Sequence, residues 1–326
     1  MLDMGRTRLY RNGKLEAEGF PVADVSEHVK DPSAVVWFDM CEPNEEDLRA
    51  ISEELGIHEL AVEDALQHKQ RPKLDVYESH KFLNVYAVRF DTGSGRLDVA
   101  EAAAFITPNA LVTVRNSRRF EIEEVIRRWD EAPGLTEHGI AFLLYGLLDY
   151  VVDTHFETVE AIDEQIEVLE ESVFGERAIT QGDQRRTFEI RKSLVTLRRV
   201  VMPMREVVNT LIRRNDEIGD GAMAPYYQDV YDQVLRATEW TESLRDLLSN
   251  IREAHLTMQS NKMNLIMKRV TSWAAIIAVP TLITGFYGQN VPFPGFEHSW
   301  GFWVSSVAIV LVSAVLYRSF RKRDWL

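Results

Sequence analysis

Two uncharged, apolar runs lie close to the end of the chain. The first, Val270–Tyr287, contains 18 residues, and the second, Trp300–Tyr317, follows it after 12 residues. At a rise of ~1.5 Å per residue, an 18-residue helix is roughly 27 Å long, just enough to cross the hydrocarbon core of a bilayer. Because the connecting loop is short, the two runs are predicted to form a transmembrane hairpin that leaves both chain ends on the same side of the membrane.

A helical pattern occupies the chain before the first run. Apolar residues recur every three or four positions over Gly139–Phe174, which predicts one long helix with an acidic second half. The basic segment Gln184–Asp216 predicts a second helix, and the opposite charges predict an antiparallel pair with complementary faces. From Pro225 no strong helix breaker occurs before Pro280, so a third helix runs directly into the membrane. A helix of roughly 60 residues needs partners along its length.

Residues 1–138 have a different pattern, of short apolar runs separated by turn signals. The helix expected here is Asn44–Gly56, with Asn44 as its cap and Gly56 as its stop. Strands are expected at Val35–Met40, Lys81–Phe90, Val99–Thr107 and Ala110–Arg115. These elements predict a mixed α/β domain, a sheet with helices at its margins. The fold class is therefore an α+β cytoplasmic domain, a long α-helical stalk and two transmembrane helices.

The same patterns divide the chain into six parts. An α/β domain (1–138) is followed by an antiparallel helical hairpin (139–224) and by a stalk helix that continues into the first transmembrane helix (225–287). An outer loop (288–299), the second transmembrane helix (300–317) and a basic tail (318–326) complete the chain.

The orientation of the hairpin follows from the basic residues that flank it. The outer loop contains no Lys or Arg, and no apolar run near Met1 has the form of a secretory signal. We therefore expect both termini in the cytoplasm and the chain in the inner or plasma membrane. The basic residues beside the two runs are Lys262, Lys268 and Arg269 before the first, and Arg318, Arg321, Lys322 and Arg323 after the second.

The net charge and the residue composition exclude several classes of partner and reaction. A formal net charge of −14 argues against nucleic acid as a partner, and it suits either the attraction of cations or plain solubility. The single cysteine, Cys41, excludes an internal disulfide and a multi-cysteine zinc site. The sequence contains no phosphate loop, no nucleophile with a matching base and no clustered His and Cys ligands. It therefore predicts neither an enzyme nor an organic cofactor.

The segment Tyr287-Gly288-Gln289-Asn290 at the end of the first run resembles the signature of the CorA family of divalent-cation channels, Tyr-Gly-Met-Asn. The resemblance covers essentially the whole chain and implies a funnel-shaped homopentamer that carries magnesium, with cobalt and nickel as further cargo. Other family landmarks, in family order, are Glu63-Asp64, HKQRPKLDVYE (68–78), PYYQDVYD (225–232), SNKMNLIMK (260–268) and FRKRDWL (320–326).

The resemblance assigns Gly288, Gln289 and Asn290 to a selectivity loop. Magnesium holds its water shell tightly, so backbone and amide oxygens can select the hydrated ion without stripping it. Gln289 stands in place of the family's methionine, which leaves the choice among magnesium, cobalt, nickel and zinc open. The pore-lining positions implied by the resemblance are Glu253, Asn264, Val270, Ala278, Thr281 and Gly285. The spacing of positions 253, 264, 271, 278, 281, 285 and 288 keeps one helical face in line, as either a pore lining or a packing seam would.

The resemblance also implies a regulatory cation between neighbouring subunits. The matching acids are Asp64, with Glu63 beside it, and Asp229 on the stalk of the next subunit. Carboxylates that face each other repel when no metal is bound, so loss of cytoplasmic magnesium favours opening. Taken singly, each acid also fits a solvated surface position. Glu297 and His298 in the outer loop either attract incoming cations or are simply solvated.

Two alternatives remain open at the level of sequence. One is a zinc transporter of the same superfamily, with proton coupling as an option. The other is a membrane-anchored coiled-coil scaffold or sensor whose hairpin does not conduct. Small and polar residues within the first run, and Asn290 at its end, argue against a simple anchor. In the favoured interpretation the partners are further copies of the chain, the lipid bilayer and divalent cations, and magnesium is both substrate and regulatory ligand.

Overall fold

The computed structural model describes residues 6–67, 70–175, 180–213, 221–289, 292, 295–296 and 298–326. Two compact units are present, Met1–Ser249 and Asn250–Leu326. The finer division into six parts stays a prediction.

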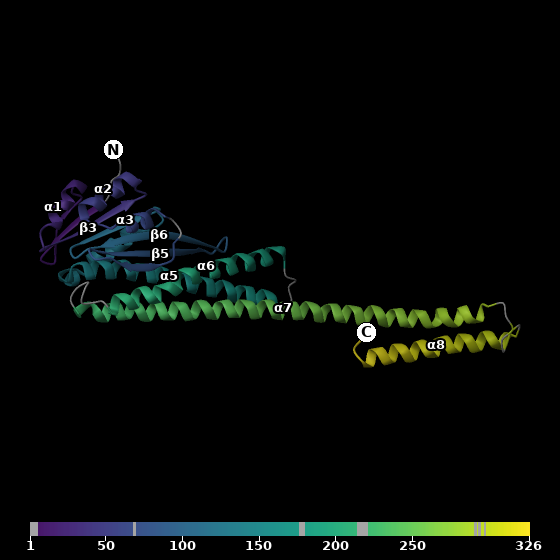
Figure 1. Cartoon of the computed structure of the whole chain (residues 1–326). Coiled ribbons are helices and arrows are strands. Elements are labelled where there is room, and N and C mark those ends of the chain that lie inside the picture. The colour runs from purple at the N-terminus through teal and green to yellow at the C-terminus, as the bar shows by residue number, and fades with distance from the viewer. Residues whose placement is uncertain are drawn as a thin grey trace. The chain divides into compact units, whose positions relative to one another are not determined.

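A seven-stranded sheet forms the centre of the first unit (Figure 1), in the order β2-β1-β3-β7-β6-β5-β4. Only β3 and β7 pair in parallel among neighbouring strands of this described sheet, and the other pairs are antiparallel. The four predicted strands are confirmed, with small shifts at their ends. The strands are β1 (Arg6–Arg11), β2 (Lys14–Glu18), β3 (Ala34–Cys41), β4 (Lys73–Val76), β5 (Lys81–Asp91), β6 (Arg96–Ile106) and β7 (Ala110–Arg115).

The hairpin of β1 and β2 was not among the predicted elements, although the sequence carries a signal for it. Asn12 and Gly13 both have positive φ, at 50° and 74°. Asn-Gly is the pair most typical of a tight hairpin turn. The strand that follows this turn, β2, contains few apolar residues, so the sequence shows no clear strand pattern there.

Helices cover both faces of the sheet, so the expectation of helices at its margins is wrong. Consecutive strand residues point to opposite faces. Trp37 and Leu83 lie in the core with α4 and α5, whereas Phe38 and Phe82 lie in the core with α2 and α3. The helices before the long hairpin are α1 (Val25–Val29), α2 (Glu45–Leu55), α3 (Glu59–Leu66) and α4 (Ile122–Glu131), with short 3-10 turns at η1 (Val22–Asp24) and η2 (Pro133–His138).

Local signals explain the ends of α2. The side chain of Asn44 accepts a hydrogen bond from the backbone N–H of Asp47 at 2.7 Å, and Gly56 closes the helix in the left-handed conformation with φ 66°. An oxygen cap and a left-handed glycine satisfy backbone groups that a helix end leaves free. Both predicted ends are confirmed.

The long helices α5 (Ile140–Phe174) and α6 (Gln181–Arg213) are present and in contact. Their predicted charge pairing is wrong: among the described residues, no ion pair joins the acidic half of α5 to a basic side chain of α6. Instead Arg186 donates to backbone oxygens of the turn after β5 and to Gln165, and Arg198 lies 3.5 Å from Glu242. The buried positions of both helices are mainly apolar, such as Ile166 and Leu194.

After the short turn η4 (Gly221–Met223), helix α7 runs over Ala224–Tyr287, and α8 spans Ser299–Lys322. The first turns of α7 belong to the core of the first unit, where Tyr227, Val230 and Val234 are buried. The later part of α7 and the whole of α8 are long and apolar enough to cross a membrane. Only 6% of the residues in each apolar window are buried, unlike the core helices of a soluble protein.

The contact between α4 and α5 supplies a first testable prediction. Trp129 is buried, and its indole N–H donates to the backbone oxygen of Leu143 at 3.1 Å. A Cβ atom at Gly146 would lie 2.5 Å from the Trp129 Nε1 atom. Overpacking of this kind costs about 1–3 kcal/mol, so Gly146→Ala should lower the thermal unfolding midpoint by about 5 °C.

The matched control for this variant is Gly182→Ala in the first turn of α6, where the nearest neighbour of a new Cβ is the Thr180 hydroxyl at an ordinary 3.4 Å. Alanine favours helix over glycine, so the control should keep or raise the midpoint. Thermal unfolding of the purified chain, followed by circular dichroism, measures both. A Gly146→Ala midpoint equal to that of the native chain would contradict the steric argument.

Candidate pore face and regulatory carboxylates

The six predicted pore-lining residues lie on α7 in the second unit. At 100° per residue they fall within roughly 120° of the helix circumference. All six are exposed in the single chain, so none of the elements that the structure describes buries this face. The residues are Glu253, Asn264, Val270, Ala278, Thr281 and Gly285. A face of this kind is available for a neighbouring helix, for water or for lipid.

Hydroxyl groups near the end of this face bond to their own helix. Thr281 Oγ1 donates to the Ile277 oxygen at 3.0 Å, and Thr284 Oγ1 donates to the Pro280 oxygen at 2.9 Å. Back-bonding leaves the hydroxyl lone pairs available as acceptors. A Cβ atom at Gly285 would meet nothing within 4 Å. Near the C-terminal end of α7, this face therefore carries small side chains and hydroxyl oxygen atoms.

The C-terminal end of α7 is tight. Gly288 N donates to the Thr284 oxygen at 2.8 Å, and Gln289 N donates to the Phe286 oxygen at 3.3 Å. A Cβ atom at Gly288 would lie only 3.1 Å from the Thr284 oxygen, so glycine allows this close turn. The side chain of Gln289 is exposed.

Two predicted residues of the outer loop, Asn290 and Glu297, lie outside the described residues. His298 is exposed just before α8, and its Nδ1 atom lies 3.0 Å from the Phe296 oxygen. Roles in ion selection or attraction therefore stay predictions for all three.

Among the described residues, the side chains of the regulatory candidates Glu63 and Asp229 each accept a hydrogen bond from a nearby glutamine. Glu63 Oε1 accepts from Gln67 Nε2 at 2.7 Å, and Asp229 Oδ2 accepts from Gln233 Nε2 at 2.9 Å. Each glutamine follows its acid by four positions in the chain, so neither hydrogen bond fixes the acid to another helix or strand. Both carboxylates remain able to turn toward a ligand.

Asp64, at the end of α3, is held more firmly. Its Oδ1 atom accepts from Gln70 Nε2 at 2.6 Å, and its Oδ2 atom lies 2.6 Å from Lys73 Nζ. Lys73 also lies 2.8 Å from Asp75. Burial alone would raise the pKa of Asp64, but the hydrogen bonds from Lys73 and Gln70 outweigh it and lower that pKa. Asp64 is therefore an ionised carboxylate, and its cationic partner is the ammonium group of Lys73.

Sequence reasoning missed Gln70 and Lys73, although both lie in the segment that carries the resemblance. The available signal was a basic residue nine positions after Asp64, at the start of a strand. The contact forms because the chain returns from α3 into β4, where Lys73 pairs in register with Asn84. No helical or strand period relates the two positions.

The part of the chain that the structure describes does not build a complete metal site by itself. The described residues contain no group of three or more His, Cys, Asp or Glu side chains placed to hold a metal ion. Carboxylate oxygens are nevertheless the ligands that Mg²⁺ prefers, and it usually keeps several waters. A cation at Asp64 would need its remaining ligands from water or from another subunit.

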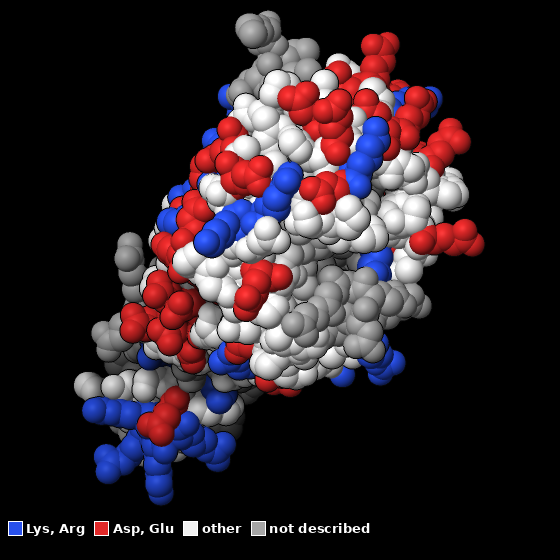
Figure 2. Space-filling model, turned by 90° about the vertical axis from the view of Figure 1, so that its left-hand side faces the viewer, with Lys and Arg blue, Asp and Glu red and all other residues white. Residues whose placement is uncertain are grey.

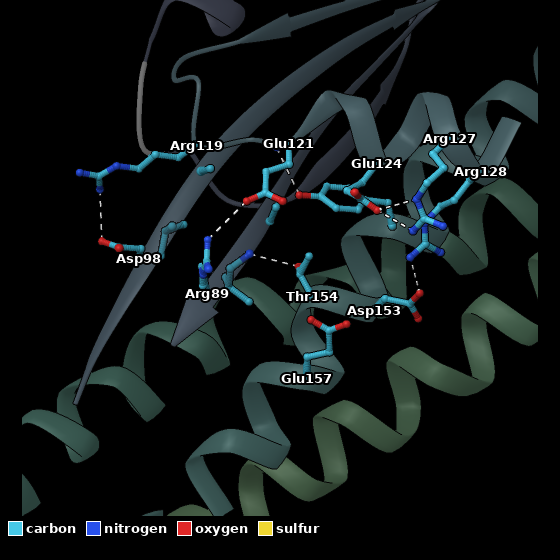
Figure 3. Close-up of a pocket in the computed structure, with 15 residues that line it drawn as sticks. Arg89, Asp98, Arg119, Glu121, Glu124, Arg127, Arg128, Asp153, Thr154 and Glu157 are labelled. Atoms are coloured by element: carbon cyan, nitrogen blue, oxygen red, sulfur yellow. Dashed lines mark hydrogen bonds and ion pairs between the residues drawn. The ribbon is translucent and has the colours of Figure 1, made fainter. Parts of the chain in front are cut away.

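A charged cleft of about 690 Å³ opens beside α4 and α5 in the first unit. Figure 3 shows its arginines facing carboxylates: Arg128 lies 2.6 Å from Asp153, and Arg127 lies 2.6 Å from Glu124. Its volume suits a small ligand. Because its charges pair within the cleft, it offers no concentrated field of one sign to select such a ligand. Acidic side chains also gather on the face shown in Figure 2, in keeping with the net charge of −14.

The family called CorA-like Mg2+ transporter protein matches residues 32–322. This chain belongs to that family. The cobalt/magnesium transport protein CorA of Thermotoga maritima is 31% identical over 300 residues, which are 91% of this chain and 85% of that protein. The putative metal ion transporter YfjQ of Bacillus subtilis is 30% identical over 279 residues, 85% of this chain and 86% of the relative.

A solved structure confirms the fold class. The complete CorA magnesium transporter of Methanocaldococcus jannaschii superposes with a TM-score of 0.81, at 21% identity, over 100% of both chains. The predicted α/β domain, long helix and pair of candidate transmembrane helices are thus confirmed. The predicted family is confirmed as well, and its members are divalent-cation transporters rather than enzymes.

Proposed function

We propose that this chain is a channel subunit that admits magnesium, and with it cobalt and nickel, across the inner or plasma membrane. The observation that carries the proposal is the exposed face of α7, where small and polar residues lead to the tight end at Gly288. Magnesium enters down its electrochemical gradient, since an inside-negative potential draws cations inward. No organic cofactor takes part. The basic residues that flank both spans support cytoplasmic termini.

Several copies of the chain surround one pore in this proposal, and the family resemblance makes the assembly a homopentamer. The later part of α7 is exposed in the single chain, and this supports association, because long helices gain their stability from packing. Each copy contributes Gly288, Gln289 and Asn290 to a ring at the outer mouth. Below that ring the pore passes the six exposed residues of the α7 face.

Carboxylates at subunit boundaries regulate this pore. Asp64 and Glu63 of one copy face Asp229 of the next, and magnesium bound between them offsets their repulsion. When cytoplasmic magnesium falls, the acids repel and the open state gains population. Glu297 and His298 lie at the entrance, where a negative side chain raises the local concentration of cations.

Flux into sealed vesicles tests this function. The full chain is reconstituted with a magnesium-sensitive dye inside, and protein-free vesicles serve as the control. We expect magnesium entry that zinc inhibits only weakly. Dominant zinc flux with little magnesium entry would overturn the proposed substrate, and a pH gradient that drives it would indicate proton coupling. Absence of any divalent flux from assembled protein would favour a non-conducting scaffold.

A further inference from the structure

The side chain of Asp64 is already occupied by donors of its own chain. Gln70 takes one carboxylate oxygen and Lys73 the other, each at 2.6 Å. Only 24% of the Asp64 side chain is exposed. A carboxylate of this kind keeps free lone pairs but no free charge, because the ammonium group has neutralised it. A divalent cation at Asp64 therefore meets a positive charge.

The position of Lys73 is fixed by more than this one contact. Its ammonium group also lies 2.8 Å from Asp75 and 5.5 Å from the centre of the Phe82 ring. Phe82 and Asp75 are directly opposite each other in the β4–β5 register. Lys73 is 29% exposed, so solvent screens the contact only in part. The sheet edge thus holds the ammonium group between two carboxylates.

Asp75 is a second ion-pair partner for Lys73 when a cation binds Asp64. The side chain of Asp75 is 40% exposed and already lies within ion-pair distance of the Lys73 ammonium group. A cation that displaces Lys73 from Asp64 would leave the ammonium group paired with Asp75 rather than bare. Removing a partially buried charge from its only partner is costly, whereas shifting it between two partners is not. The arrangement therefore permits exchange.

We propose that Lys73 is an internal competitor for the regulatory cation: it shares Asp64 with the ion and keeps the affinity of that site low. This inference rests on the regulatory site of the proposed function. At low cytoplasmic magnesium Lys73 occupies Asp64. At high magnesium the ion takes Asp64, and Lys73 pairs with Asp75 alone.

The test measures magnesium binding to the full chain in lipid nanodiscs, read as the magnesium concentration that half-protects the chain from limited proteolysis. Lys73→Met removes the charge and keeps an unbranched stem. Removing one unit charge about 4 Å from the ion should lower this midpoint about tenfold. Lys73→Arg keeps the charge and should stay within about twofold of the native midpoint, since only the geometry of the donors differs.

Lys73→Gln is a second neutral variant, and it can still donate a hydrogen bond to Asp64. It should give the same shift as Lys73→Met, so a folding defect in either one alone does not decide the outcome. Unchanged or raised midpoints in both neutral variants, or a native chain that magnesium never protects, would overturn the inference.

Asp64→Asn separates this inference from the site on which it rests. The variant should raise the midpoint, and in the Asp64→Asn background the change Lys73→Met should have no further effect. If Asp64→Asn leaves the midpoint unchanged, the regulatory site itself lies elsewhere and the competition falls with it. If Asp64→Asn raises the midpoint but the neutral Lys73 variants do not lower it, the site stands and the competitor role is wrong. Vesicle flux tests conduction independently of both results.

Discussion

The Asp39→Asn chain is expected to unfold on the order of 10 °C below the native chain, because breaking a buried ion pair costs about 3–5 kcal/mol. Asp39 on β3 is 1% exposed. It accepts two-pronged hydrogen bonds from Arg115 on β7, the shortest being 2.6 Å from Nη2 to Oδ2. Burial would lower the pKa of Arg115, but its bonds to Asp39 raise that pKa. Without the carboxylate, a buried guanidinium group remains charged and unneutralised.

The loss of the Asp39 carboxylate also affects a hydrogen-bond network between the neighbouring strands β3 and β7. Asp39 also accepts from Thr113 Oγ1 at 2.7 Å, and that hydroxyl in turn accepts from Trp37 Nε1 at 3.2 Å. The three residues and Arg115 link the only parallel strand pair among the described strands, β3 and β7. Asparagine supplies an amide where an acceptor is needed, so part of the network loses a partner.

A surface ion pair in the same unit is the matched control. Arg119 and Asp98 lie 3.2 Å apart with side chains 70% and 58% exposed, and exposed pairs contribute at most about 1 kcal/mol. Asp98→Asn should therefore leave the unfolding midpoint nearly unchanged. The double variant with Asp39→Asn and Arg115→Met should recover part of the loss, since no buried charge is left. Equal midpoints for Asp39→Asn and Asp98→Asn would contradict the argument.

Local sequence signals predicted the elements of this fold where one residue decides one position. Asn44 and Gly56 fix the ends of α2 through a single hydrogen bond and a single left-handed residue. The apolar period of α5 persists over 35 residues, so no competing pattern obscures it. Short elements such as α3 and β4 were missed because eight or four residues contain too few periods.

Contacts between distant positions were not predictable in the same way. The opposite net charges of α5 and α6 predicted helices that meet through complementary charged faces, yet buried apolar residues such as Ile166 and Leu194 line their contact. Net charge describes the solvated face of a helix, and hydrophobic burial decides which faces meet. The bond between Asp64 and Lys73 likewise depends on how the chain returns from α3 into the sheet.

The candidate pore shows the reverse case. Its residues were placed by family resemblance, and the single chain leaves all six of them exposed. Helical spacing predicted that they share a face, because spacing on one helix is a local property. Which partner covers that face depends on other copies of the chain, so neither the period nor the single chain determines it.

Asn290→Ala is expected to reduce magnesium entry into vesicles by at least about tenfold. The amide oxygen of Asn290 is proposed to contact the water shell of the ion at the outer mouth, just beyond the tight end of α7 at Gly288. Each lost hydrogen bond to a charged species weighs ~1.5–3 kcal/mol, and a symmetric ring loses one in every copy. Alanine offers no oxygen in its place.

Gln289→Met is the matched control for this variant, since it alters the neighbouring loop residue and leaves Asn290 intact. The two side chains are similar in length, and methionine restores the family's own signature, Tyr-Gly-Met-Asn. We expect Gln289→Met to retain magnesium entry, and any change to fall on the preference among magnesium, cobalt, nickel and zinc. Dye-based flux is compared at equal protein content, after size-exclusion chromatography has shown equal assembly. Because both variants lie in the same loop, a general disturbance of α7 would lower the flux of both. Loss confined to Asn290→Ala places the selecting oxygen at residue 290, and undiminished flux in Asn290→Ala would remove this loop from the mechanism.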